Sequence, residues 1–156
     1  MSLVDSYISY LSGFLSGLAS IDGAIREKCL NVFDVSYNSN LSLEENFFTF
    51  YPELNGLGFT SSMIEFGEIE SLIQGWILRK PLGLELDVTD WKSFLAFRIM
   101  DYLSWCFSDD VDCSLLDVYS AELTEKDGVK VKYLIIPHES KALYILFQNT
   151  VTIEGD

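Results

Sequence analysis

The segment from residue 115 to residue 147 limits the possible folds of this chain more than any other part. Three runs in it are rich in β-branched and aromatic residues, as strands are: 116–123, 129–136 and 142–147. Asp127-Gly128 separates the first two runs, and glycine accepts the positive φ that a tight turn needs. Pro137 and the polar residues 138–141 end the second run and turn the chain. We therefore predict a three-stranded antiparallel meander, with a fourth strand at 150–154 as an open alternative.

The middle run also predicts how the sheet is covered. Side chains alternate between the two faces of a strand, so Tyr133 and Ile135 should lie on one face and Leu134 and Ile136 on the other. Both faces are then apolar at this strand. We therefore expect the central strand to be covered on both sides, at least in part.

The chain before the meander has apolar residues at helical spacing, which predicts several helices. Four residue pairs resemble the capping boxes that open helices: Ser2 with Asp5, Ser42 with Glu45, Ser62 with Glu65, and Asp87 with Asp90. We expect helices after the first, third and last pairs, and the helix after the third pair should end with Arg79 and Lys80 in its last turn, before Pro81. The run 47–51, after the second pair, is too short for periodicity to decide between a helix and a strand.

Three further expectations concern this helical part. Apolar residues at 25–33 predict a short helix, and the glycines at 56–58 predict that the next stretch is irregular. The first helix has one face of small uncharged residues, which we expect to pack on a neighbouring helix, with a partner surface as the alternative. The last helix ends near residue 107 and carries Phe97 and Trp105 opposite its main apolar face, so we expect it to lie between two layers.

Together these patterns predict an α+β protein in which N-terminal helices pack on a C-terminal three- to four-stranded antiparallel meander. The helical part should span about residues 2–107 and the sheet about residues 115–154. A chain of 156 residues suits one domain with a substantial core. We therefore assign residues 1–156 to a single domain.

The charge of the chain is strongly unbalanced, with 24 acidic against 10 basic residues and a net charge of −14. Such a surface repels nucleic acid and anionic membranes, and it attracts basic proteins. Simple solubility is the alternative explanation of this acidity. We expect a basic protein partner, with no direct nucleic-acid partner and no membrane partner.

Cysteine and histidine usage argues against a metal site and against a disulfide framework. Cys29, Cys106 and Cys113 are an odd number without C-x-x-C spacing, and the chain has one histidine. We expect all three thiols to be reduced and no cofactor to be bound. The first residues lack a basic signal-peptide region, and the uncharged stretch 6–21 is shorter than the ~20 apolar residues of a membrane span. We therefore expect a soluble, cytoplasmic protein.

The sequence contains no motif for catalysis, so we expect no enzymatic activity. His138 is the single imidazole and lies in a predicted exposed turn, and no G-x-S-x-G stretch is present. The acidic loop at 109–112 lacks the spacing, the central glycine and the closing glutamate of an EF-hand. The alternative from another class is a small enzyme or ligand-binding domain with a pocket between helices and sheet.

Acidic residues gather in three clusters, which we predict to bind the partner: Glu65, Glu68 and Glu70; Glu85 and Asp87; and Asp109, Asp110, Asp112 and Asp117. The third cluster precedes a well-defined strand, so its charges would lose little entropy on binding. We expect an exposed aromatic side chain nearby to act as an anchor for the partner.

In size, acidity and mixed helix-and-strand architecture, the chain resembles the bacterial immunity proteins of contact-dependent inhibition and other polymorphic toxin systems. The resemblance implies a protein without enzymatic activity that binds a cognate toxin, such as a nuclease domain. It would block the active site of the toxin or another surface that the toxin needs. A phage-type inhibitor that mimics the charge of nucleic acid is the alternative.

Overall fold

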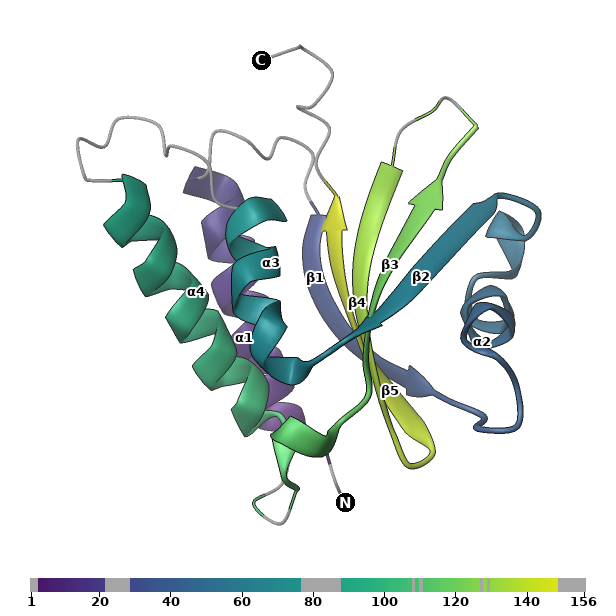
Figure 1. Cartoon of the computed structure of the whole chain (residues 1–156), viewed down its shortest axis with the longest axis horizontal. Coiled ribbons are helices and arrows are strands. Elements are labelled where there is room, and N and C mark those ends of the chain that lie inside the picture. The colour runs from purple at the N-terminus through teal and green to yellow at the C-terminus, as the bar shows by residue number, and fades with distance from the viewer. Residues whose placement is uncertain are drawn as a thin grey trace.

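The computed structural model describes residues 3–21, 29–76, 88–107, 109, 111–126, 128 and 130–148. These residues form three layers, with three helices on one face of a β-sheet and one helix on the other (Figure 1). The predicted α+β class is therefore confirmed. Some predicted features lie outside the described residues: Glu85, Asp87, Asp110 and the fourth strand at 150–154.

The elements have the following bounds. The α-helices are α1 (Asp5–Ile21), α2 (Leu43–Phe50), α3 (Ile69–Trp76) and α4 (Val88–Trp105). The short 3₁₀ turns are η1 (Pro52–Leu54), η2 (Phe66–Glu68) and η3 (Cys113–Leu115). The strands are β1 (Cys29–Ser36), β2 (Gly58–Ile64), β3 (Val118–Thr124), β4 (Lys130–His138) and β5 (Lys141–Gln148).

The described sheet is antiparallel throughout, with its strands in the order β1-β5-β4-β3-β2. The predicted meander forms its centre, but the sheet has five strands instead of three or four. Gly128 adopts φ 87° in the first turn, as expected of a glycine there. In the second turn Glu139 takes the left-handed conformation, with φ 59°. β4 continues through Pro137, which pairs with Ala142, instead of ending at the proline.

The sequence predictions are wrong at the two edge strands of the described sheet. The short helix expected at 25–33 is replaced by β1, which pairs with β5 over its whole length. The spacing of Leu30 and Phe33 fits a helix as well as a strand, and only the distant partner decides between them. The stretch expected to be irregular is β2, so Ser62 lies inside a strand and does not cap a helix. β2 shows no apolar alternation because most of this edge strand is exposed.

Hydrophobic clusters lie on both faces of the sheet, as the alternation in β4 predicts. Leu134 and Ile136 are fully buried on the face that α1, α3 and α4 cover. Tyr133 and Ile135 are buried on the opposite face, in the cluster that contains Phe47 of α2. The prediction that the central strand is covered on both sides is therefore confirmed.

The outer surfaces of α1 and α4 are more exposed than expected. Phe97 and Trp105 on α4 are 56% and 45% exposed, so this face of α4 is not enclosed between two layers. On the small face of α1, Ser6 and Ser9 are exposed, and a Cβ added at Gly13 would meet no atom within 4 Å. The expectation that α4 lies between two layers is therefore wrong, and Ser6, Ser9 and Gly13 of α1 do not pack on a neighbouring helix.

Ser42 opens α2 with a complete capping box, as predicted. Its hydroxyl accepts a hydrogen bond from the Glu45 N–H at 3.1 Å, and its own N–H donates to the Glu45 carboxylate at 2.8 Å. We expect Ser42→Ala to lower the free energy of unfolding by about 1 kcal/mol, because one N–H of the helix loses its acceptor. Urea denaturation of the two proteins measures this difference, and an unchanged midpoint would contradict it.

Candidate functional site

The pairing of β2 with β3 brings two of the predicted acidic clusters to one end of the molecule. Ile64, the last residue of β2, pairs with Val118, the first residue of β3. The next residues along each strand are Glu65 and Asp117. Antiparallel register places them opposite each other, just beyond the end of the paired strands. Residues that are far apart in the sequence therefore place their carboxylates at the same edge.

The turns that flank this strand pair extend the same acidic surface. η2 contacts η3, and Glu68 ends η2 while Asp112 caps η3. The Asp112 carboxylate accepts hydrogen bonds from the N–H and the hydroxyl of Ser114, at 3.1 and 2.7 Å. These bonds hold the pKa of Asp112 below its ordinary value, so the charge of this side chain is stabilised.

We call five exposed carboxylates the acidic end: Glu65, Glu68, Asp109, Asp112 and Asp117. No described lysine or arginine lies within 4.0 Å of any of them. The ion pairs of lysine and arginine in the described chain lie elsewhere: Arg98 with Asp101, Lys130 and Lys132 with Glu122, and Lys141 with Asp34. The negative charge of the acidic end is therefore not neutralised by described cationic side chains.

The remaining predicted binding residues contribute less to this surface. Glu70 lies in the first turn of α3 and is half-buried. Glu85 and Asp87, which form the second predicted cluster, and Asp110 lie outside the described residues.

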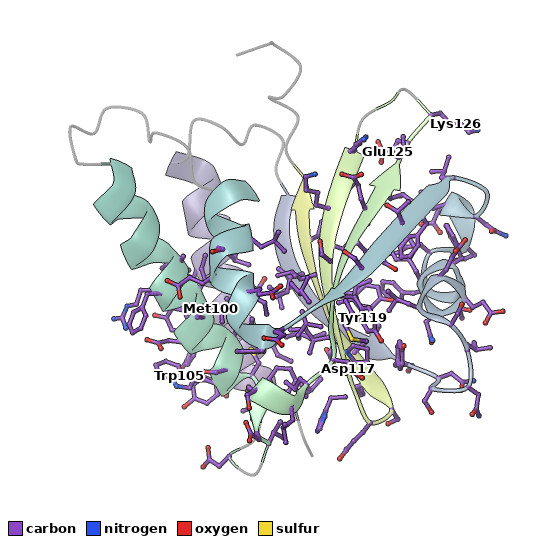
Figure 2. All side chains as sticks on the ribbon, in the orientation of Figure 1. Met100, Trp105, Asp117, Tyr119, Glu125 and Lys126 are labelled. Carbon is purple, nitrogen blue, oxygen red and sulfur yellow. The ribbon has the colours of Figure 1, made fainter. Side chains whose placement is uncertain are left out.

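Large exposed apolar side chains are present near the acidic end and on the neighbouring helix. Leu115 in η3 is 79% exposed and Met63 in β2 is 60% exposed, and both are close in sequence to its acids. Trp105, at the end of α4, is 45% exposed, and its ring lies 5.7 Å from Tyr7 and 5.5 Å from Tyr102 between centroids. Figure 2 shows Trp105 at the outer surface of the last turn of α4. These side chains are available as apolar contacts for a partner.

A hollow of about 710 Å³ opens on the face of the sheet that α2 covers in part. Its lining comes from the segment after β1, the start of β3 and the β4–β5 turn: Tyr37, Asn38, Asp117, Tyr119, Glu139 and Ser140. We call it the tyrosine hollow. Figure 2 shows Asp117 and Tyr119 together at the start of β3, far from Glu125 and Lys126 at the other end of the strand. The hollow therefore adjoins the acidic end through Asp117.

The pKa values of both tyrosines of this hollow are raised by burial and by the same carboxylate. Partial burial raises the pKa of Tyr119, and the negative charge of Asp117 raises it further. Burial also raises the pKa of Tyr37, followed by the effects of Tyr119 and then Asp117. Both phenols therefore stay neutral at physiological pH, with Asp117 close enough to act on each of them.

Asn46 fixes the segment that forms one rim of the tyrosine hollow. Its side chain is buried at 6% exposure, and its Oδ1 accepts a hydrogen bond from the Asn38 N–H at 2.9 Å. Its Nδ2 donates to the carbonyls of Asn38 and Ser42, at 2.9 and 3.0 Å. The Tyr37 N–H donates to the Ser140 carbonyl at 2.8 Å, which joins this rim to the β4–β5 turn. The rim is therefore held at both ends.

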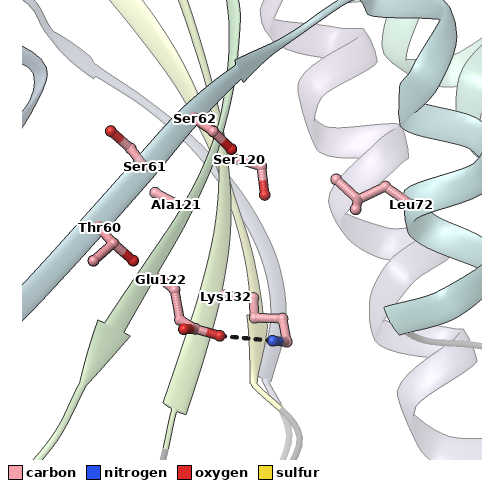
Figure 3. Close-up of a pocket in the computed structure, with 8 residues that line it drawn as sticks. All are labelled: Thr60, Ser61, Ser62, Leu72, Ser120, Ala121, Glu122 and Lys132. Atoms are coloured by element: carbon pink, nitrogen blue, oxygen red, sulfur yellow. Dashed lines mark hydrogen bonds and ion pairs between the residues drawn. The ribbon is translucent and has the colours of Figure 1, made fainter.

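A second hollow, of about 330 Å³, lies between the sheet and α3. Hydroxyls of Thr60, Ser62 and Ser120 line it on the sheet side, and Leu72 faces them from α3 (Figure 3). Lys132 Nζ lies 2.8 Å from Glu122 Oε2 in the same hollow, and this hydrogen bond lowers the pKa of Glu122. The two ionised groups neutralise each other, so the lining is polar without net charge.

The described thiols line neither hollow, and His138 lies beside the tyrosine hollow, with its Nε2 3.8 Å from Glu139 Oε2. His138 is less exposed than a turn residue was expected to be, at 21% for its side chain, and its ring packs edge-on against Phe107 at 6.0 Å. Cys106 and Cys113 are free thiols, and burial raises the pKa of Cys106 to about 12. No disulfide joins these two cysteines, and the side chain of Cys29 lies outside the described residues, so the reduced state of all three thiols stays a prediction.

Comparisons with known proteins return no match to a family model, to a curated protein or to a solved structure. Among the described helices, none has both the length and the apolar character needed to cross a bilayer. The acidic end and the tyrosine hollow could not be found as sites from the sequence, because the pairing of β2, β3 and the β4–β5 turn assembles both of them.

Proposed function

We propose that this protein is a non-enzymatic inhibitor, an immunity protein that binds a cognate basic toxin in the cytoplasm and neutralises it. The toxin would be a nuclease domain or another domain with a basic functional surface, as in contact-dependent inhibition. The observation that carries the proposal is the acidic end, where carboxylates from two separate segments lie together without described cationic partners.

The physical logic is that of electrostatic steering. A cluster of like charges on a protein of net charge −14 attracts a basic surface over several ångströms and speeds their encounter. The strand ends and short turns hold Glu65, Asp112 and Asp117, so little conformational freedom is lost when a partner binds. Exposed Leu115 and Met63 supply apolar area that would slow dissociation.

The steering argument predicts the effect of neutralising part of the acidic end. In the double variant Glu68→Gln/Asp112→Asn, association with the toxin should be roughly three- to tenfold slower at low salt and less dependent on ionic strength. The dissociation rate should change by less than about twofold, because both side chains are exposed. Asparagine at position 112 can still cap η3, so the fold should be retained. Stopped-flow kinetics at several salt concentrations measures both rates.

The matched control removes the same charge at the opposite end of the sheet. Gly58 pairs with Thr124, which places Glu53, shortly before β2, and Glu125, after β3, at that end. The double variant Glu53→Gln/Glu125→Gln should therefore leave the association rate close to that of the wild type. Equal slowing by the two double variants would mean that only the net charge matters, and it would remove the acidic end from the interface.

The inhibitor function itself is tested with the partner captured from the native host. Expression of that partner alone should stop the growth of a bacterial cell, and co-expression of this protein should restore growth. A toxic partner whose effect is unchanged by this protein would rule out immunity. A harmless nucleic-acid-binding partner would instead favour mimicry of nucleic-acid charge.

A further inference from the structure

The tyrosine hollow combines flat aromatic walls with negative charge. Tyr37 and Tyr119 provide phenol rings, and Asp117 and Glu139 provide carboxylates, within one space of about 710 Å³. Aromatic faces attract cations, and the attraction is strongest where a neighbouring carboxylate pairs with the same cation. Asp117 acts on both phenols, so its charge lies close to the two rings that a cation would contact.

Two basic residues lie nearest to this hollow along the chain, and both belong to the other face of the sheet. Lys141 lies 3.2 Å from Asp34, and the ring of His138 packs against Phe107. His138 Nε2 also lies 3.8 Å from Glu139 Oε2, so Asp117 is the carboxylate of the hollow without a described basic side chain within 4.0 Å. Leu134 and Ile136, which share the face of His138 by strand alternation, belong to the cluster beneath α1, α3 and α4. Among the described residues, none with a positive charge lines the hollow.

The hollow is also held in shape before any ligand arrives. Asn46 fixes the backbone of Asn38 through two hydrogen bonds of 2.9 Å, and Tyr37 is tied to Ser140 by a bond of 2.8 Å. Tyr119 and Pro137 belong to the paired strands β3 and β4. A preformed site of this kind loses little entropy on binding.

We propose that the tyrosine hollow binds an arginine side chain of the basic partner. A guanidinium group is planar, so it stacks on a phenol ring while its N–H groups donate to a carboxylate such as Asp117. An ammonium group is more strongly hydrated and lacks the flat face, so lysine fits this combination less well. The size of the hollow leaves room for the backbone next to the arginine, with Asn38 and Ser140 as polar contacts. The identity of the partner rests on the proposed function, but the preference for a guanidinium does not.

A small probe tests the hollow without any partner. N-acetyl-arginine amide, titrated into the ¹⁵N-labelled protein at about 150 mM salt, should shift the amide resonances of Tyr37, Asn38 and Tyr119 most. We expect a dissociation constant of roughly 1 mM, as for a ligand of this size. The lysine probe of the same design should bind at least threefold more weakly, and the neutral citrulline probe at least tenfold, as order-of-magnitude expectations.

Variants then assign the binding to this hollow. Asp117→Asn and Tyr119→Leu should each weaken the arginine probe roughly fivefold or more, while Glu125→Gln, an equal charge change at the other end of β3, should leave it within about twofold. Asp117 is exposed, so Asp117→Asn should fold normally. This variant therefore still tests the hollow if Tyr119→Leu does not fold. Equal losses in Asp117→Asn and Glu125→Gln would overturn the proposal, as would binding of the citrulline probe at the same strength. Because no toxin is present, this result is independent of the growth assay.

Discussion

Replacing Phe47 with alanine is expected to lower the free energy of unfolding by about 3–5 kcal/mol, a large part of the total stability of a domain. The Phe47 side chain is fully buried, and its ring lies 4.8 Å from Phe59 and 5.0 Å from Tyr51 and Tyr133 between centroids. α2 is the only described α-helix on this face of the sheet, so no neighbouring helix can move in to fill the cavity.

Phe50→Ala is the matched control, because it removes the same side chain from the same helix. Phe50 is 41% exposed, so we expect this variant to cost about 1 kcal/mol. Urea denaturation followed by near-ultraviolet circular dichroism separates the two variants. Similar losses in both would show that Phe47 does not hold the cluster on this face together.

The second large effect is expected for Asn46→Ala, at about 2–3 kcal/mol. The change leaves the Asn38 N–H without its acceptor. It also removes one of the two donors to each of the carbonyls of Asn38 and Ser42, which still accept from the N–H groups of Leu41 and residue 46. The Asn46 side chain is buried, and a backbone N–H left without a partner in such a place costs about 1–3 kcal/mol. Thermal and urea denaturation measure the loss of stability.

Asn40→Ala serves as the control for Asn46→Ala, because Asn40 is exposed in the same segment. This variant should lower the free energy of unfolding by less than about 0.5 kcal/mol.

Binding of the arginine probe gives a second measurement, which links Asn46 to the tyrosine hollow. Because Asn46 holds the rim, Asn46→Ala should weaken binding of the arginine probe, while Asn40→Ala should not. A fully stable Asn46→Ala variant would mean that the segment 38–42 keeps its shape by other means.

Local patterns in the sequence predict the elements whose signals are local. The turn at Gly128, the alternation of Tyr133 to Ile136, and the capping box at Ser42 all specify their structure within a few residues. The same holds for α1 and α4, whose long apolar faces leave no other assignment.

The edge strands are harder to predict because their structure depends on distant partners. β1 carries apolar residues at a spacing that suits either a helix or a strand, and it becomes a strand by pairing with β5. β2 contains Thr60, Ser61 and Ser62 in succession, so it has no buried face to detect.

In the candidate site, too, the residue types can be read from the sequence, but their arrangement depends on strands that pair over long distances in the chain. Glu65, Asp112 and Asp117 stand out in the sequence as acidic residues, but their adjacency follows from the β2–β3 register. The tyrosine hollow gave no signal in the sequence at all. Its tyrosines are ordinary strand and loop residues, and they meet only because the loop after β1 reaches the start of β3.

The pairing of β1 with β5 also has a consequence for the time course of folding. Asp34 and Lys141, which lie on these neighbouring strands, are separated by 107 positions along the chain. Contacts of such high sequence separation close slowly, because a long loop must lose its freedom before the pairing is gained. On the ribosome, β1 has no described strand partner until β5 emerges, so its edge stays open for a long part of synthesis. Any activity that needs the finished sheet therefore begins only after translation has passed β5.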